Sequence, residues 1–187
     1  MMHQPDFFES CSWAANEIAT LDWPKHGVFI TLGLAPTNGV SSISGFNRAH
    51  QENVKKLMRL VKDVYHETVF TKRSYRLGDE WSPCIIVPEQ RSKETGAIIP
   101  VHIHAVFTDR RKHVITKFMN HQQEFRRSIM KPWCWRPEGQ AVFPGLSIDI
   151  KRIEPGEIEQ TVQYCAKYSY DVIDQVHGKM PDGKVYA

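Results

Sequence analysis

Two histidines, His102 and His104, lie two residues apart within the apolar stretch 101–107. Successive side chains of a β-strand point to opposite faces, so both imidazoles are expected on one face. Val101 and Ile103 would then point into a core on the other face. Paired imidazoles at this spacing can share one divalent metal ion. The alternative interpretation is a pair of solvated or hydrogen-bonded histidines that bind no metal.

Two tyrosines, Tyr164 and Tyr168, lie four residues apart with Lys167 between them. The segment 157–173 follows a Pro-Gly pair and carries an apolar stripe at helical spacing, which predicts a helix. Residues four apart share one face of a helix, so the two phenols would stack on neighbouring turns. The stripe already supplies the core contacts, which favours a chemical role for this pair over ordinary core packing.

These segments resemble those of HUH-type single-strand DNA endonucleases, the class of rolling-circle replication initiators, relaxases and single-tyrosine transposases. His102-Ile103-His104 is similar to the histidine–hydrophobe–histidine motif of that class. Residues 164–168 resemble its two-tyrosine "Y-x-A-K-Y" motif, which is typical of phage-type and some plasmid-type initiators. Residues 29–34 resemble its first motif, an apolar strand of the "F-x-T-L" kind. The three motifs follow the family's order and span roughly residues 28–172.

One position departs from that pattern. Many relatives carry a lysine three residues after the second tyrosine, where this chain has Asp171. Lys167 instead stands three residues after Tyr164, which is the single-tyrosine "Y-x-x-K" spacing. In some plasmid-type relatives the second tyrosine is the nucleophile, which favours Tyr168. The sequence therefore leaves open whether Tyr164, Tyr168 or both attack.

The resemblance implies that a tyrosine attacks single-stranded DNA and forms a covalent 5′-phosphotyrosine with a free 3′-hydroxyl. Lys167 could offset developing negative charge or depress the tyrosine pKa. The cofactor implied is Mg²⁺ or Mn²⁺, and such hard cations prefer oxygen ligands, so two imidazoles rarely complete their site. Relatives often add a carboxylate from the strand preceding the histidine strand. Glu89 is the candidate for that third ligand, with Gln160 as an outside option.

The segment 109–136 concentrates positive charge, with eight Lys and Arg side chains against two Asp and Glu. Basic groups for phosphates beside flat aromatics for bases are typical of surfaces that bind single strands. The alternative is a solvated helix face with two packing tryptophans. The candidate DNA-binding residues are Arg110, Arg111, Lys112, Arg126, Arg127, Lys131, Trp133 and Trp135.

The order of the expected strands and helices predicts an α+β fold around a central antiparallel sheet flanked by helices. The resemblance implies that the core of this fold is ferredoxin-like. Three parts are expected: an N-terminal helical extension over 1–27, an endonuclease domain over 28–173 and a loosely ordered tail over 174–187. The expected strands are 28–34, 68–75, 84–87, the histidine strand and 146–153. The expected helices are 6–21, 47–67, 114–130 and 157–173.

The 187-residue chain has four scattered cysteines without a Cys-x-x-Cys pair, which fits reduced thiols in the cytoplasm. No apolar run approaches ~18 residues, so no membrane partner is expected. The partners expected are single-stranded DNA or a DNA hairpin at an origin, with host helicase and polymerase as further partners. The leading hypothesis is a replication initiator that nicks and rejoins DNA. The alternatives are a transposase or relaxase with the same chemistry, and a non-catalytic nucleic-acid-binding module.

Overall fold

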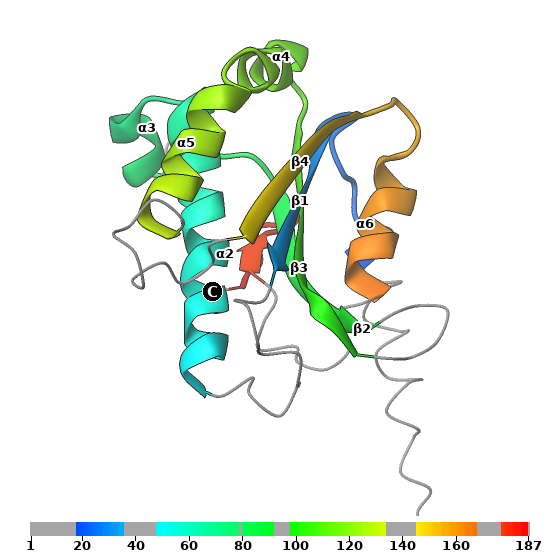
Figure 1. Cartoon of the computed structure of the whole chain (residues 1–187). Helices are drawn as coiled ribbons and strands as arrows, with labels where there is room; N and C mark the ends of the chain where they lie inside the picture. Colours follow the sequence, from blue (N-terminus) through cyan, green and yellow to red (C-terminus); the bar gives the residue numbers. More distant parts are fainter. Residues whose placement is uncertain are drawn as a thin grey trace, which may run out of the picture.

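The computed structural model describes residues 18–35, 48–78, 80–91, 98–133, 145–167 and 177–186. Within these ranges one sheet stands between two layers of helices, with α2 and α5 on one side and α6 on the other (Figure 1). The elements are β1 (His26–Ala35), α2 (Arg48–Val69), α3 (Lys72–Arg76), β2 (Cys84–Arg91), β3 (Ile98–Asp109), α4 (Lys112–Asn120), α5 (Gln122–Trp133), β4 (Gly145–Ile153), α6 (Ile158–Lys167), β5 (His177–Lys179) and β6 (Val185–Tyr186).

The described sheet has six strands in the order β4-β1-β3-β2-β5-β6, and each neighbouring pair is antiparallel. Its first four strands and their helices follow the β-α-β-β-α-β order of a ferredoxin-like core, with β1 and β3 in the centre. The prediction of an α+β fold with a central antiparallel sheet flanked by helices is confirmed.

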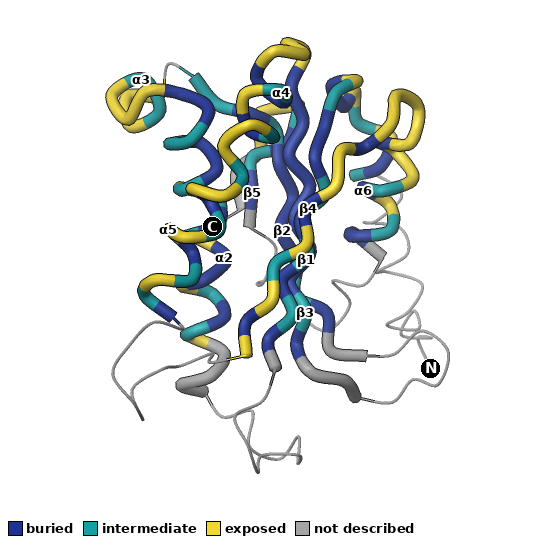
Figure 2. Tube along the Cα trace, turned by 45° about the horizontal axis from the view of Figure 1, so that its top comes forward, coloured by how far each residue is buried: buried dark blue, intermediate teal, exposed yellow. Residues whose placement is uncertain are grey.

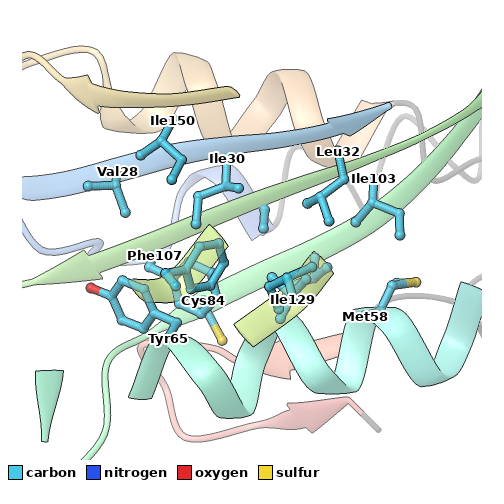
Figure 3. Packing of buried hydrophobic residues seen from close by; sticks show 14 of the residues in the cluster. Val28, Ile30, Leu32, Met58, Tyr65, Cys84, Ile103, Phe107, Ile129 and Ile150 are labelled. Atoms are coloured by element: carbon cyan, nitrogen blue, oxygen red, sulfur yellow. The ribbon is translucent and has the colours of Figure 1, made fainter. Parts of the chain in front are cut away.

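The larger core lies between the sheet and the layer formed by α2, α4 and α5 (Figure 3). From β1, Val28, Ile30 and Leu32 are fully buried in this core. Tyr65 of α2 stacks on Phe107 of β3 with ring centroids 3.8 Å apart. Burying such large apolar side chains fixes which face of β3 turns inward, and therefore which face is left for the histidines.

The smaller core lies on the other face of the sheet, where α6 packs. Val87 of β2 and Val106 of β3 are fully buried there, together with Val162 and Cys165 of α6. The chain leading into β1 also packs on this core through Trp23. The alternating residues Val101, Ile103, Ala105 and Phe107 lie in the larger core, as the pattern of 101–107 predicts. The burial of Val106 in a second core was not predicted.

Two predicted elements differ from the structure. Residues 68–75 were expected as a strand, but α2 continues to Val69 and α3 follows. Thr71 caps α3 by accepting a hydrogen bond from the Ser74 N–H at 3.1 Å. Tyr75 of α3 stacks on His66 of α2 with centroids 4.6 Å apart. This packing overrides the strand preference of the β-branched and aromatic residues in the segment. The single helix expected over 114–130 is the pair α4 and α5.

The prediction of a loosely ordered tail over 174–187 is wrong for residues 177–186. β5 pairs with β2, and β5 and β6 form a hairpin that extends the sheet. A Cβ at Gly178 would lie 2.1 Å from the Cys84 carbonyl oxygen, so the close approach of these strands requires glycine. Gly183 has φ +86° in the hairpin turn. Glycine at this position permits the backbone conformation of the tight turn.

Residues 6–17 of the expected helix over 6–21 lie outside the described residues. Within its described end, Ile18 and Ala19 are helical. None of the described helices combines the length and the apolar character needed to cross a membrane.

A network of buried polar side chains lies beside the larger core, at the C-terminal end of β3. His66 of α2 donates through Nδ1 to the Lys62 carbonyl at 2.7 Å and accepts through Nε2 from the Ser82 N–H at 3.1 Å. Burial lowers the pKa of His66 below its usual value of about 6.5. Ser82 also donates its hydroxyl to Asp109 at 3.0 Å. Burial tends to raise the pKa of Asp109, but its bonds to Arg111 outweigh that effect and lower it.

The lowered pKa of His66 predicts a loss of stability in mild acid. The unfolded chain takes up the proton first, so this contribution is complete above about pH 6.5 and is lost as the pH falls toward the lower folded pKa. His66→Gln should flatten the dependence of the unfolding free energy on pH between about 7 and 5. Urea denaturation across that range measures the slope. His113→Gln, at an exposed histidine of α4, is the control, and equal slopes in both variants would contradict the assignment.

Candidate active site

The antiparallel register of β2 and β3 brings Glu89 beside the two histidines. Glu89 is the cross-strand neighbour of His102, and Val87 is the neighbour of His104. The Glu89 carboxylate oxygen Oε2 lies 2.6 Å from His104 Nε2. Glu89 is 7% exposed and His104 is 5% exposed. The structure therefore joins two of the three predicted metal ligands in a buried carboxylate–imidazole pair.

Two residues of β1 hold the other sides of His104. Thr31 is its cross-strand neighbour, and Thr31 Oγ1 lies 3.3 Å from His104 Nδ1. Phe29, two residues earlier on the same face, stacks almost parallel on the His104 ring with centroids 5.5 Å apart. Both ring nitrogens of His104 consequently have hydrogen-bonding partners, while one ring face is covered.

Helix α6 brings Tyr164 to this pair. The Tyr164 ring meets the His104 ring edge-on, with centroids 5.7 Å apart, and meets Phe29 in the same manner at 6.2 Å. Val162 and Ala166, on either side of Tyr164 in the sequence, are buried in the smaller core and fix the helix on the sheet. The half-buried Tyr164 is thereby placed next to a histidine sixty residues earlier in the chain.

His102 has a different environment from His104. Its ring lies nearly parallel to that of His104, with centroids 6.4 Å apart. Its Nδ1 is buried and has no hydrogen-bond partner among the described residues. On β1, Gly33 lies directly opposite, and a Cβ there would come within 2.7 Å of Ser147 Oγ and 3.8 Å of the His102 ring. The missing Cβ at Gly33 thus allows Ser147 and the His102 ring to approach β1 closely.

The donor chemistry of this cluster fits a divalent metal ion. Two imidazoles and a carboxylate project from neighbouring strands, and the buried Nδ1 of His102 lacks a partner. As they stand in the described part of the chain, however, no three His, Cys, Asp or Glu side chains are gathered closely enough to hold a metal. Glu89 bonds to His104 instead, so metal binding would require that hydrogen bond to be exchanged. The metal site remains a prediction.

Several other predicted site residues lie at the limit of the described part of the chain or outside it. Lys167 is the last residue of α6, and its side chain lies outside the described part, as do Tyr168 and Trp135. Gln160, the outside option for a ligand, is exposed on the first turn of α6. Sequence reasoning missed the contacts that Phe29 and Thr31 make with His104. The alternation of side chains along β1 could have predicted these contacts. It places Phe29 and Thr31 on the face of the sheet opposite to the buried Ile30.

The predicted DNA-binding helices α4 and α5 lie across the sheet from α6 (Figures 1 and 2). Three of the proposed DNA contacts bond to or pack among other residues of the fold, and a fourth, Arg110, makes an exposed ion pair. Arg126 bonds to the Ile148 carbonyl of β4, and Trp133 is buried in the larger core. Arg111 bonds to Asp109 at 2.9 Å and Glu80 at 3.2 Å. These three side chains stabilise the fold around the helices.

The remaining described basic residues are exposed: Arg110, Lys112, Arg127 and Lys131. Arg110 makes an exposed pair with Asp22 at 3.3 Å, of a kind that contributes little to stability. Arg127 and Lys131 lie four residues apart on α5 and share its outer face. DNA binding by these exposed residues stays a prediction. Because Arg111, Arg126 and Trp133 bond or pack within the fold, the continuous surface predicted from all of these residues loses three of its members.

No family model, curated protein sequence or solved structure matches this chain. Its function is therefore inferred from its own residues and their geometry.

The buried Glu89–His104 bond predicts a clear effect on stability. Glu89→Ala leaves His104 Nε2 without its acceptor in a buried position, which should lower the unfolding free energy by about 1–3 kcal/mol. Glu89→Gln, which keeps an acceptor oxygen, should lose less. Chemical denaturation without added metal measures both. Glu159→Ala, at an exposed position of α6, should change little, and a loss in Glu89→Ala no larger than in this control would refute the contribution of the bond.

Proposed function

We propose that this protein is a metal-dependent nickase and strand transferase of single-stranded DNA, with Tyr164 as its nucleophile. The contact between Tyr164 and His104 is the observation that supports it most strongly, because two independently identified motifs meet there. Neither the spacing of the histidines nor the helical pattern of 157–167 requires this meeting. A structural tyrosine on α6 could have packed anywhere along the smaller core.

The chemistry assigns one task to each residue. Tyr164 loses its phenol proton, and its oxygen attacks the phosphorus in line with the departing 3′-oxygen. The new tyrosine–phosphorus bond leaves a 5′-phosphotyrosine, and the departing oxygen takes up a proton to become a 3′-hydroxyl. A phenol with a pKa near ~10 needs help at neutral pH. His102, His104 and Glu89 would hold Mg²⁺ or Mn²⁺, which as a Lewis acid neutralises charge on the phosphate.

The packing of α6 supports the positioning that such an attack requires. Phe29 and His104 hold the Tyr164 ring from the sheet, and Val162 and Ala166 anchor the helix. Restricting a nucleophile to one orientation removes much of the entropic cost of reaction. Tyr168, four residues after Tyr164 in the sequence, is the proposed second nucleophile, which would accept the strand in a second transfer.

The two-tyrosine pattern favours a replication initiator over a transposase or relaxase. Its DNA substrate would be a single strand or a hairpin at an origin, and host helicase and polymerase would act after the nick. The exposed Arg127 and Lys131 would bind flanking phosphates, away from the tyrosine.

A nucleic-acid-binding module without catalysis is the second candidate. The observation that favours it is the Glu89–His104 hydrogen bond, because the same nitrogen would have to serve as a metal ligand. In that case the histidines would have a structural role only, and DNA binding would be independent of metal.

Formation of a covalent adduct separates these candidates. The full chain is incubated with a labelled pool of random single-stranded and hairpin oligonucleotides, with Mn²⁺ or with EDTA, and resolved on a denaturing gel. We expect an adduct with Mn²⁺ alone. Tyr164→Phe keeps the ring packing but lacks the attacking oxygen, so adduct formation should fall by roughly a thousandfold or more. Tyr164→Phe combined with Tyr168→Phe should eliminate it.

The control is Tyr75→Phe, since Tyr75 lies on the opposite side of the sheet and its hydroxyl donates to Asp63 at 2.7 Å. Replacing both His102 and His104 with alanine should abolish adduct formation. An undiminished adduct in the Tyr164 variant would reject this nucleophile. Salt-dependent binding by the wild-type chain with no adduct in any metal would favour the binding module.

A further inference from the structure

The two histidines of the cluster are held to different degrees. His104 has a partner on each ring nitrogen, Glu89 on Nε2 and Thr31 on Nδ1. Among the described residues, the buried Nδ1 of His102 has no hydrogen-bond partner. The difference arises in β1, where the residue opposite His104 is a threonine and the residue opposite His102 is Gly33. The strand thus supplies a hydroxyl to one imidazole and no side chain to the other.

We propose that Thr31 is a positioning residue, whose hydroxyl holds the His104 ring in place whether its Nε2 bonds to Glu89 or to a metal ion. The inference rests on the proposed function and adds to it a residue that touches neither the DNA nor the metal. It assigns a chemical task to the first motif, which the sequence indicated only as an apolar strand.

The reasoning follows the proton on the imidazole. The bond between His104 Nε2 and Glu89 Oε2 is compatible with the tautomer in which Nε2 carries the proton and donates it. In a neutral imidazole Nδ1 is then an acceptor, and the Thr31 hydroxyl donates to it. Nε2 must lose its proton to serve as a metal ligand, and a neutral ring then carries the proton on Nδ1.

A hydroxyl suits both arrangements because it can donate or accept by rotating about one bond. In the second arrangement Nδ1–H donates to Thr31 Oγ1, which is the partner that a metal-bound histidine needs on its other nitrogen. Valine has nearly the same shape as threonine and can do neither.

The surroundings restrict the His104 ring further. Phe29 covers one face of the ring, and Tyr164 meets it edge-on. Thr31 is β-branched and lies on the central strand β1, so its side chain has little rotamer freedom. Loss of the hydroxyl would therefore remove the hydrogen bond that Thr31 makes with Nδ1 of this ring.

The test compares Thr31→Val with Thr31→Ser in the full chain. The first readout is the ¹⁵N resonance of His104 Nδ1 without metal, assigned by its loss in His104→Gln. The second is the affinity for Mn²⁺ alone, by calorimetry without DNA. Thr31→Val should move the resonance toward that of a nitrogen without a hydrogen bond. It should also weaken Mn²⁺ binding about 10- to 100-fold, as expected for loss of a second partner of a metal-binding histidine.

Thr31→Ser restores a hydroxyl and should recover most of both properties. Thr31→Ala provides a second variant without the hydroxyl, should the valine variant fail to fold. The matched control is Thr108→Val, which removes the hydroxyl of a buried threonine on β3 that bonds to the Pro83 carbonyl at 3.3 Å. It should leave the His104 resonance and the Mn²⁺ affinity unchanged.

The outcomes distinguish the two proposals. Wild-type protein that binds Mn²⁺, together with a Thr31→Val variant that binds it equally well, would overturn the role of Thr31 and leave the proposed function standing. Wild-type protein that neither binds Mn²⁺ nor forms an adduct would overturn both. A weakened Thr31→Val variant that serine does not rescue would assign the effect to packing and reject the hydroxyl.

Discussion

The antiparallel register across β1, β3 and β2 is the constraint on which the site depends. It sets Thr31 opposite His104 on one side and Glu89 opposite His102 on the other. A shift of one residue in either pairing would turn the partners of the histidines to the opposite face of the sheet. The register is fixed by the larger core, where β1 and β3 bury every second residue against the helices. The packing of the apolar face thus determines which polar side chains meet on the opposite face of the sheet.

The buried Glu89–His104 bond connects this framework with function. Burying a carboxylate and an imidazole costs free energy that a pair of apolar side chains would not incur, and good hydrogen bonds are needed to offset it. The structure provides them through Glu89, His104 and Thr31. Tyr164 lies against this arrangement from α6, while Gly33, opposite His102, carries no side chain that could bond to it. A cluster that only stabilised the smaller core would not need the tyrosine.

Much of the fold was predictable because its signals are local. The period-two alternation of 101–107 assigns both histidines to one face, and the helical stripe of 157–167 turns Val162 and Cys165 inward. The contacts of His104 were less accessible, because cross-strand partners depend on a register that long-range packing sets. Glu89 was chosen as the residue ending the preceding strand, but its bond to His104 Nε2 could not be read from the sequence. The strand expected over 68–75 was wrong for the same reason. Tyr75 stacks on His66, and this contact between segments stabilises the helical conformation of the residues around Tyr75.

Peptide mapping of the covalent adduct tests the proposed chemistry most directly. Trypsin cleaves after Lys167, so Tyr164 falls in the peptide 153–167, and Tyr168 and Tyr170 fall in the peptide 168–179. After incubation with single-stranded DNA and Mn²⁺, nuclease trimming leaves a nucleotide mass on the attacking tyrosine. We predict that first-strand cleavage places this mass on the peptide 153–167, at Tyr164. A nucleotide found only on the peptide 168–179, or on neither peptide, would contradict the assignment of Tyr164 as the nucleophile.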